Sequence, residues 1–334
     1  MDRIVANLPL TLACGPYDRT EALRTGLIQP EGIDLTYVPI QSPPEIFSRM
    51  IKKDSFDVSE MSAAVHFQLR ARGDRRYVAL PVFPSRLFRH GYIFVNTHAG
   101  IREPRDLNGK RVGVQEYRQT AAVWIRGMLQ HEYGVDLRSI HWLEGGVNTP
   151  RAHDPEVDLQ PAEGFTISHI GADRTLDQLL QSGEIDCVLG ARQPNSLRSH
   201  PDDVAKLFPN SREVEQDYYR RTGLFPMMHT VAMRRDLHEA KPWVSDSLYK
   251  AFVQAKEWCW QQMHFSGAAR YMLPWLFDDI DELERLFGGD PWPYGLEENR
   301  RSLEALNHYL VEQGLMPEPL DVDELFTPIV LSNE

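Results

Sequence analysis

Short apolar runs alternate with segments of helical periodicity along the first third of the chain. In the segment 43–51, Ile46, Phe47 and Met50 recur at the spacing of one helical face, which predicts a helix there. By the same reasoning, strands are predicted at 5–13, 35–40, 56–61, 78–82 and 92–95, and helices at 21–26 and 63–72. Strands that alternate with helices in this way predict an α/β fold.

The same alternation restarts at residue 111. Strands are predicted at 111–114, 140–143 and 187–189, and helices at 121–132, 175–182 and 213–220. The segment 145–167 is rich in Pro, Asp and Glu and predicts a surface excursion. An apolar strand at 224–233 would return the chain to its first half, and long helices are expected at 243–265 and 296–313.

This order predicts that one lobe is inserted into the other. We expect lobe 1 to comprise residues 1–95 and 228–334, and lobe 2 to comprise residues 96–227. Each lobe would hold a mixed sheet flanked by helices, with a cleft between the lobes. This is the two-lobed architecture of type II periplasmic-binding-protein folds. A length of 334 residues supports it, since one domain usually has about 100–200 residues.

The segment 106–120 has the pattern of a ligand-binding loop. Asn108 and Gly109 predict a turn, the run RVGV at 111–114 suits a buried strand, and a helix is expected to begin near Thr120. The free N–H groups at the start of that helix would favour a carboxylate or a phosphate. An ordinary strand-to-helix connection explains the same pattern, so the surroundings must decide.

Charge and composition restrict the partners. The formal net charge is −12, which argues against nucleic acid or an acidic membrane surface, because both require basic protein surface. A small anionic ligand is compatible with this negative net charge, since salt screens exposed charges that lie beyond about 10 Å from the ligand. No run approaches 18 apolar residues, so no membrane span is expected.

The three cysteines, Cys14, Cys187 and Cys259, are widely spaced and suit neither a disulfide framework nor a zinc site. The run LTLAC before Cys14 is superficially similar to a lipoprotein cleavage site, but Asp2, Asn7 and Pro9 argue against a signal peptide. We therefore expect a cytoplasmic protein. Self-association into a homo-oligomer is left open by the sequence.

Several motifs together carry a family resemblance. The run DLNGKRVGV at 106–114 resembles the second-lobe opening of a superfamily of substrate-binding proteins. Four sharper runs are PVFPSRLFRH at 81–90, QEY at 115–117, DYYRRTGLFPMMH at 217–229 and WPYGLEENR at 292–300. With these, the chain resembles the 4,5-dihydroxyphthalate decarboxylase family over nearly its whole length. The resemblance implies a soluble enzyme that converts a dihydroxyphthalate, a small aromatic dicarboxylate, to protocatechuate and carbon dioxide.

The implied reaction needs no cofactor. Each carboxylate of 4,5-dihydroxyphthalate lies para to a hydroxyl, so loss of the hydroxyl proton pushes electrons toward the carbon that carries the leaving group. Protonation of that carbon gives a dienone, which regains aromaticity when carbon dioxide leaves. The site must therefore supply cations for the remaining carboxylate, a base or acceptor for the phenol, and an acid for the ring carbon.

Arg86 and His90 are the leading candidates for a cation and an acid. In an extended segment they would share one face, with Arg89 opposite as a structural ion-pair partner. A guanidinium can bind a carboxylate through two parallel hydrogen bonds, and histidine titrates near neutral pH. The alternative for His90 is a hinge histidine bonded to the backbone.

Other candidates follow predicted strands, where α/β lobes place their ligand loops. His229 would lie in the returning strand, with a buried core histidine as the alternative, and either Glu60 or Glu116 could be the base, although an exposed loop glutamate is commoner. Helix capping is the alternative for the loop 17–20, and surface exposure for Arg192. The remaining expected substrate contacts are Tyr17, Asp18, Arg19, Ser62, Tyr117 and Thr120.

No metal site is expected, because His66, His131 and His308 lack paired ligand spacing and suit packing or the surface.

Two other functions remain open. One is a solute receptor for an aromatic carboxylate, which the absence of an export signal argues against. The other is a different lyase on the same fold, which turnover assays would distinguish.

Overall fold

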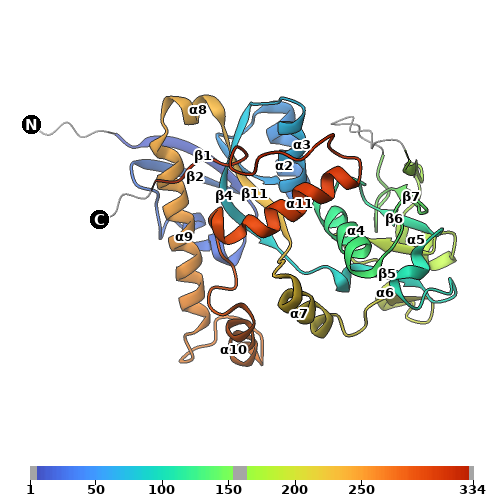
Figure 1. Ribbon diagram of the computed structural model, residues 1–334. Coiled ribbons are helices and arrows are strands. Elements are labelled where there is room, and N and C mark those ends of the chain that lie inside the picture. The colour runs from blue at the N-terminus through green and yellow to red at the C-terminus, as the bar shows by residue number, and fades with distance from the viewer. Residues whose placement is uncertain (1–5, 153–163, 331–334) are drawn as a thin grey trace, which may run out of the picture. The chain divides into compact units, whose positions relative to one another are not determined.

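A computed structural model describes residues 6–152 and 164–330 (Figure 1). The chain divides into two compact units, which are described separately. Unit 1 comprises Met1–Ser85, His229–Arg300 and Leu320–Glu334, and unit 2 comprises Arg86–Met228 and Arg301–Pro319. Each unit contains one mixed β-sheet with helices packed against it.

The sheet of unit 1 has the strand order β2-β1-β3-β11-β4. Its strands are β1 (Leu8–Cys14), β2 (Ile33–Pro39), β3 (Val58–Ser62), β4 (Tyr77–Arg86) and β11 (Met227–Arg234). The strand β1 is parallel to β2 and β3, whereas β11 is antiparallel to β3. Because β11 runs the opposite way, its beginning lies at the same edge of the sheet as the ends of β1 and β3.

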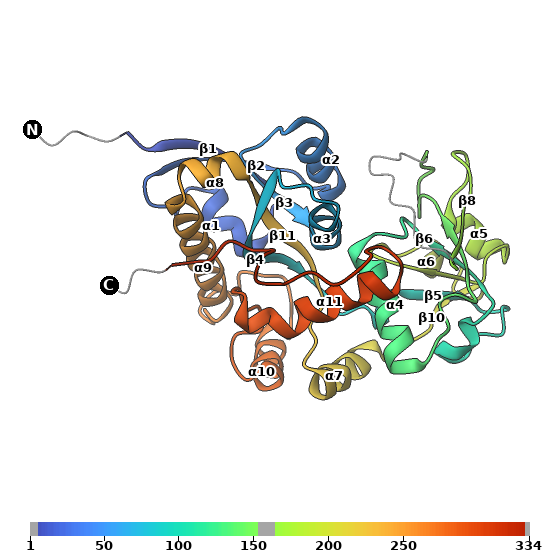
Figure 2. The ribbon, with the colours of Figure 1, turned by 45° about the horizontal axis from the view of Figure 1, so that its top comes forward.

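Both faces of this sheet are buried, because successive side chains of β1 alternate between two apolar clusters. Leu10, Leu12 and Cys14 belong to the cluster on one face, whereas Ala13 belongs to the cluster on the other. The first face is covered by α1 (Glu21–Arg24) and α9 (Trp243–Met263), which lie side by side in Figure 2. The second is covered by α2 (Pro43–Lys53) and α3 (Ala63–Ala71).

Four further helices belong wholly or largely to unit 1. They are η1 (Asp18–Thr20), α8 (Arg235–Ala240), α10 (Leu276–Phe287) and η4 (Glu297–Asn299). The helix α10 was not among the expected elements. It is amphipathic and buries Leu276 and Ile280, whereas Asp278 in its first turn is exposed.

The sheet of unit 2 has the strand order β10-β5-β9-β6-β7-β8. Its strands are β5 (Ile93–Asn96), β6 (Arg111–Val114), β7 (His141–Glu144), β8 (Thr166–His169), β9 (Cys187–Leu189) and β10 (Val204–Lys206). Its helices are η2 (His90–Tyr92), η3 (Pro104–Leu107), α4 (Thr120–Tyr133), α5 (Leu176–Ser182), α6 (Ser196–Ser199), α7 (Ser211–Thr222) and α11 (Arg300–Glu312). The parallel core β9-β6-β7-β8 agrees with the predicted strand-helix alternation in this part of the chain.

The helix α11 packs closely on α4 within unit 2. A Cβ atom on Gly127 would lie 2.2 Å from the ring of Tyr309, so only glycine permits this approach. The Gln313 side chain accepts from Nε of Arg126 at 2.8 Å and donates to the carbonyl of Val123 at 2.9 Å. These contacts explain why residues 301–319 group with unit 2, whereas the expected lobe 1 contained them, together with residues 86–95.

Most expected elements coincide with observed ones, including the strand at 111–114 and the helix that begins at Thr120. The short edge strands β8 and β10 were not expected. Part of the predicted surface excursion, residues 153–163, lies outside the described residues.

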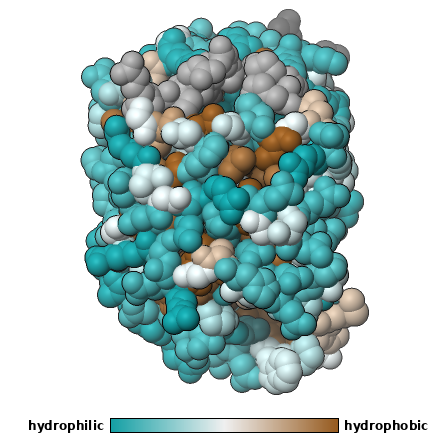
Figure 3. Space-filling model, turned by 90° about the vertical axis from the view of Figure 1, so that its right-hand side faces the viewer, coloured by the Kyte–Doolittle hydropathy of each residue, from teal (hydrophilic) through white to brown (hydrophobic). Residues whose placement is uncertain are grey.

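Among the described helices, none combines the length and apolar character that a membrane span requires. The face drawn in Figure 3 is mostly hydrophilic, with apolar side chains in small separate patches.

Candidate functional site

A cluster of hydrogen-bonded polar side chains lies at one edge of the unit 1 sheet. It gathers side chains from the loop after β1, from β3 and from the start of β11. The register of the antiparallel pair places His229 opposite Ser62 and Val231 opposite Glu60. His229 and Glu60 are therefore diagonal neighbours across two strands, a distance that their side chains can span.

Glu60 is the centre of this cluster. Its side chain is fully buried, in contrast to the exposed loop glutamate that is commoner at such positions. One carboxylate oxygen accepts from the N–H of Gly15 at 2.9 Å and from the thiol of Cys14 at 3.6 Å. The other accepts from the hydroxyl of Tyr17 at 2.7 Å and from Nδ1 of His229 at 2.5 Å. Four donors thus compensate for the burial of this charge.

These donors also determine the protonation state of the cluster. Burial by itself would raise the pKa of Glu60, but the charge of His229 and the hydrogen bonds from His229, Tyr17 and Gly15 hold that pKa below its usual value. Burial and the charge of Glu60 raise the pKa of Cys14 and of Tyr17. Glu60 is therefore a fixed carboxylate, and the thiol and the phenol remain neutral donors.

The side chain of His229 is partly exposed to solvent, at 16%, whereas that of Glu60 is fully buried. Its Nδ1 is held by Glu60, and the ring of Phe47 packs edge-on against it, with the ring centroids 5.0 Å apart. No described residue hydrogen-bonds its Nε2. A carboxylate that orients Nδ1 and leaves Nε2 open is the arrangement that general acid–base catalysis uses. The side chain is thus only partly buried, which differs from the alternative of a buried core histidine.

Arg19 supplies a cation beside this pair. Its guanidinium lies over the rings of both Tyr17 and Trp292, 4.2 Å and 4.5 Å from their centroids. Nε donates to the carbonyl of Pro84 at 2.5 Å, and Nη1 donates to Asp18 at 3.0 Å. The described residues give no partner to Nη2. Stacking and two hydrogen bonds therefore fix the guanidinium while leaving it able to bind an anion.

Asp18 and Ser62 have local roles in the structure. The carboxylate of Asp18 accepts from the backbone N–H and the Nη1 of Arg19, so it positions that residue. The hydroxyl of Ser62 accepts from the N–H of Val65 at 3.4 Å and caps the start of α3. The predicted substrate contacts of these two side chains remain predictions.

His90 departs from the expected geometry. The strand β4 ends at Arg86 and His90 begins the short helix η2, so the two residues do not share one extended segment. The imidazole is 1% exposed and lies edge-on to the rings of Tyr133, Phe208 and Tyr218. Burial, together with the charge of Arg221, lowers the pKa of His90 to about 4. A buried histidine that is neutral at pH 7 does not suit the predicted role of proton donor.

A small cavity adjoins His90. It measures about 10 Å³, roughly the space of one water, and His90, Trp124 and Met128 contribute to its lining. Neither ring nitrogen of His90 hydrogen-bonds a described residue. Arg89, expected as a structural residue, is buried beside Tyr92 at 4.9 Å, and burial lowers the pKa of Arg89 to about 10.

Arg86 is buried at the end of β4, with its guanidinium 5.0 Å from the ring of Phe225. The guanidinium of Arg86 thus makes a cation–π contact with an aromatic ring of unit 2. The predicted contact between Arg86 and a substrate carboxylate remains a prediction.

The loop after β6 holds Glu116 and Tyr117 in different environments. The carboxylate of Glu116 pairs with Arg118 at 3.2 Å and with Arg151, so its charge is already compensated. Tyr117 is 2% exposed, and the guanidinium of Arg126 lies 3.8 Å from its ring centroid. Its hydroxyl donates to the carbonyl of Gln313 at 3.4 Å. The side chain of Tyr117 therefore packs inside unit 2, which does not support its expected role in substrate binding.

Thr120 and Arg192 also belong to unit 2. Thr120 is buried in the first turn of α4, as expected from the sequence. Arg192 is exposed after β9, which agrees with the alternative of a surface residue. Arg192 follows a sheet strand, as expected, and its contact with a substrate stays a prediction.

Three further residues complete the cluster, and two of them, Trp292 and Phe47, were not expected there. Gly15 donates to Glu60, and a Cβ atom on it would lie 2.5 Å from the ring of Tyr17. Trp292 stacks on Arg19, and Phe47 supports His229. A glycine directly after a predicted strand, and the tryptophan in the family-like run 292–300, were the available signals. Neither signal identifies the partner that each residue contacts in space.

Comparison with solved structures identifies the fold class. The structure resembles the periplasmic sulfonate-binding protein of Methylobacillus flagellatus with a TM-score of 0.55, at 14% identity, covering 97% of this chain and 92% of that one. It resembles the aliphatic sulphonate-binding protein of Escherichia coli with a TM-score of 0.54, at 12% identity, covering 96% and 97%. The chain therefore has the periplasmic-binding-protein fold, as predicted.

Comparison with curated proteins identifies the family. The chain is 37% identical to a 4,5-dihydroxyphthalate decarboxylase of Comamonas testosteroni over 330 residues, which cover 98% of this chain and 99% of the relative. It is 35% identical to the protein of the same name from Pseudomonas putida over 217 residues, covering 65% and 83%. No family model matches the chain. The chain belongs to the 4,5-dihydroxyphthalate decarboxylase family, which confirms the resemblance seen in its motifs.

Proposed function

We propose that this protein is a carboxy-lyase that decarboxylates 4,5-dihydroxyphthalate to protocatechuate, with His229 as the proton donor. The observation that carries the proposal is the 2.5 Å hydrogen bond between buried Glu60 and half-buried His229, in a chain 37% identical to a decarboxylase of that substrate. A carboxylate that orients one imidazole nitrogen directs the other toward the reacting atom.

The chemistry assigned to the unit 1 cluster is one protonation and one bond cleavage. Protonated His229 gives the proton on Nε2 to the ring carbon that carries the leaving carboxylate, while the para hydroxyl gives its proton to solvent water and becomes the dienone carbonyl; solvent later returns one proton to that oxygen and one to His229. The bond to the carboxylate then breaks, carbon dioxide leaves, and the electron pair restores the aromatic ring. The oxygen regains a proton, so the net change is the replacement of one carboxylate by hydrogen.

The other members of the cluster support this step in different ways. Glu60 stabilises the protonated imidazole and is a poor base, since both its oxygens already accept hydrogen bonds. Arg19 is the candidate to bind the carboxylate that stays, because its guanidinium is held in place and Nη2 has no partner among the described residues. The assignment requires neither Glu60 nor Glu116 as a direct base, the choice left open from the sequence.

The test is turnover of the full-length protein with 4,5-dihydroxyphthalate, following carbon dioxide and protocatechuate. His229→Asn should lower kcat by about 100-fold or more, the scale of a lost general acid, while substrate affinity changes little. His238→Asn is the matched control, because His238 also lies in unit 1 and bonds through Nδ1, at 2.9 Å to Ser245, outside the cluster.

Three results would overturn the proposal in different ways. Binding of the dicarboxylate with no product would favour the alternative of a solute receptor. Turnover of a different carboxylate alone would favour another lyase on this fold. Equal turnover by the His229→Asn and His238→Asn variants would refute the assignment of the proton donor and leave the decarboxylase activity standing.

Two broader expectations accompany the proposal. A cytoplasmic location is inferred from the unpaired cysteines, all three of which are buried. Self-association is supported by exposed apolar side chains in unit 1, namely Phe265, Met272, Leu273 and Trp275. Light scattering after gel filtration would measure the mass in solution and decide between a monomer and a homo-oligomer.

A further inference from the structure

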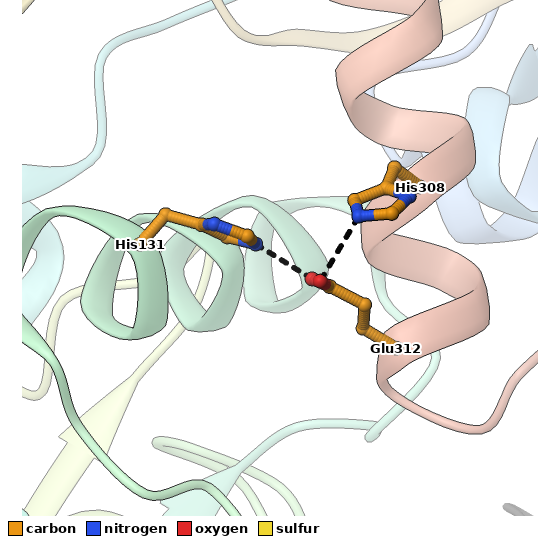
Figure 4. A group of neighbouring side chains, drawn as sticks. All are labelled: His131, His308 and Glu312. Atoms are coloured by element: carbon orange, nitrogen blue, oxygen red, sulfur yellow. Dashed lines mark hydrogen bonds and ion pairs between the residues drawn. The ribbon is translucent and has the colours of Figure 1, made fainter.

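A second group of polar side chains lies in unit 2, where α4 meets α11 (Figure 4). Among the described residues, His131, His308 and Glu312 form a group whose potential ligand atoms all lie within 4.8 Å of one another. One oxygen of Glu312 is 2.6 Å from Nε2 of His131, and the other is 3.0 Å from Nε2 of His308. Figure 4 shows both imidazoles directed toward the carboxylate.

The sequence alone does not indicate this group. His308 and Glu312 are one helical turn apart on α11, a spacing that places both on one face, but His131 is 177 positions earlier, on α4. The spacing argument against a metal site at His131 and His308 therefore misses the contribution of a second helix. Packing of the two helices supplies the third side chain.

Contacts around the group hold it in place. The ring of Tyr309 stacks on the ring of His131, with centroids 5.1 Å apart and an interplanar angle of 25°. Gln130 donates to the same oxygen of Glu312 as His131 does, at 3.2 Å. The close approach of Tyr309 to Gly127, one turn before His131, fixes the distance between the helices. The side chains are thus presented by a rigid helix pair and do not depend on a loop.

The donor set and its spacing fit a small divalent transition-metal ion. Two imidazole nitrogens and one carboxylate oxygen are ligands that Zn²⁺ binds at about 2.0–2.2 Å, with a water in the fourth position. Ligand atoms around a tetrahedral ion with such bonds are roughly 3.3 Å apart. The observed separations of 2.6 Å and 3.0 Å, and the limit of 4.8 Å, differ from this value by at most about 1.5 Å, so only small shifts are required. Exposed His131 and His308 leave the ion a path from solvent.

We propose that His131, His308 and Glu312 form a binding site for a divalent transition-metal ion such as Zn²⁺. The ion cross-links α4 to α11 and thereby stabilises the packing of residues 301–319 within unit 2. The site is distinct from the Glu60–His229 cluster and takes no part in the proposed chemistry. Because the ligands must be unprotonated, the site binds metal more weakly as the pH falls.

The test is calorimetric titration of the full-length, metal-free protein with Zn²⁺ at pH 7.5, together with melting in the presence and absence of the ion. We expect one ion per chain, and a rise of several degrees in melting temperature when Zn²⁺ is present at 100 times its dissociation constant, because the folded population then gains about 100-fold. Loss of a residue that only hydrogen-bonds a metal ligand costs about 10–100-fold in affinity, so loss of a ligand itself, in His131→Ala or His308→Ala, should weaken binding by more than about 10-fold.

His264→Ala is the matched control, because His264 is also exposed and lies 3.0 Å from a glutamate, Glu284, but forms no such group with a second histidine among the described residues. This variant should bind Zn²⁺ like the wild type. The visible spectrum of bound Co²⁺ gives a second readout, with tetrahedral bands expected in the wild type and in His264→Ala only. The proposal is overturned if the wild type does not bind Zn²⁺, or if the three variants bind it equally well.

Discussion

Replacement of Glu60 by glutamine tests the proposed site most sharply, because it keeps the shape of the side chain and removes its charge. Four donors converge on the two oxygens of Glu60, but a glutamine side chain has a single acceptor oxygen. The N–H of Gly15 is a fixed donor, so the amide oxygen must face Gly15. The amide NH₂ group then faces Tyr17 and His229, where it requires an acceptor.

His229 can provide that acceptor only by moving its proton from Nδ1 to Nε2, which yields a neutral imidazole. The variant therefore loses the ion pair that stabilises protonated His229. A hydrogen bond to a charged group contributes about 1.5–3 kcal/mol. If the variant loses this whole stabilisation of protonated His229, the activation free energy rises by the same amount and kcat falls by roughly 10- to 150-fold.

The assay is the steady-state formation of protocatechuate from 4,5-dihydroxyphthalate at pH 6–8, with kcat and KM determined separately. The fall should appear in kcat, because Glu60 is buried and, in the proposed mechanism, acts on the substrate only through His229. Glu284→Gln is the matched control, since that glutamate also pairs with a histidine, His264, but is exposed on α10. A kcat within about threefold of wild type for Glu60→Gln would refute the reasoning.

Three further predictions concern the surroundings of the site and the buried histidine of unit 2. Gly15→Ala places a Cβ atom 2.5 Å from the ring of Tyr17, so it should lower stability by about 1–3 kcal/mol and also lower kcat; an unchanged melting temperature and activity would contradict the packing argument. Arg19→Lys loses the planar stacked guanidinium and should raise KM about tenfold or more with little change in kcat, as steady-state kinetics would measure; an unchanged KM would remove Arg19 from the binding site. The pKa of His90 is lowered to about 4 in the folded chain, below the unfolded value of about 6.5, so the unfolded state binds more protons and stability is lost as the pH falls from about 6.5 toward 4. Urea unfolding should be measured at pH 7.5 and at pH 5. Between these pH values the free energy of unfolding of His90→Phe should fall by about 2 kcal/mol less than that of the wild type. Equal decreases in the two proteins would refute the lowered pKa of His90.

Much of the architecture could be predicted from local sequence patterns. Apolar runs between turn residues identified strands such as β6, and helical periodicity identified α2 and α4. These signals are local, since they depend on the alternation of side chains along one element. The family-like runs at 81–90, 217–229 and 292–300 extended the prediction to the fold and the family, both of which the comparisons confirm. The short strands β8 and β10 lie at the sheet edges and carry little periodic signal.

The candidate site depended on contacts between distant parts of the chain. The sequence identified Tyr17, Arg19, Glu60 and His229 as residues after or within strands, without indicating which would meet. The antiparallel register of β11 on β3 joins Glu60 to His229 across 169 positions, and the loop after β1 closes over them. Burial then makes Glu60 a fixed anion that orients the histidine.

For His90, contacts with distant parts of the chain argue against the role that the sequence favoured. Its residue type and its place near two arginines favoured a catalytic role, but three aromatic rings from other segments enclose it and lower its pKa. The Zn²⁺ ligands proposed on α4 and α11 likewise come together only because Gly127 lets two helices touch. Sequence pattern determined the elements and the chemical types available at their ends. Tertiary packing decided which of those groups are buried, paired and charged, because desolvation and hydrogen bonding depend on neighbours that are remote along the chain.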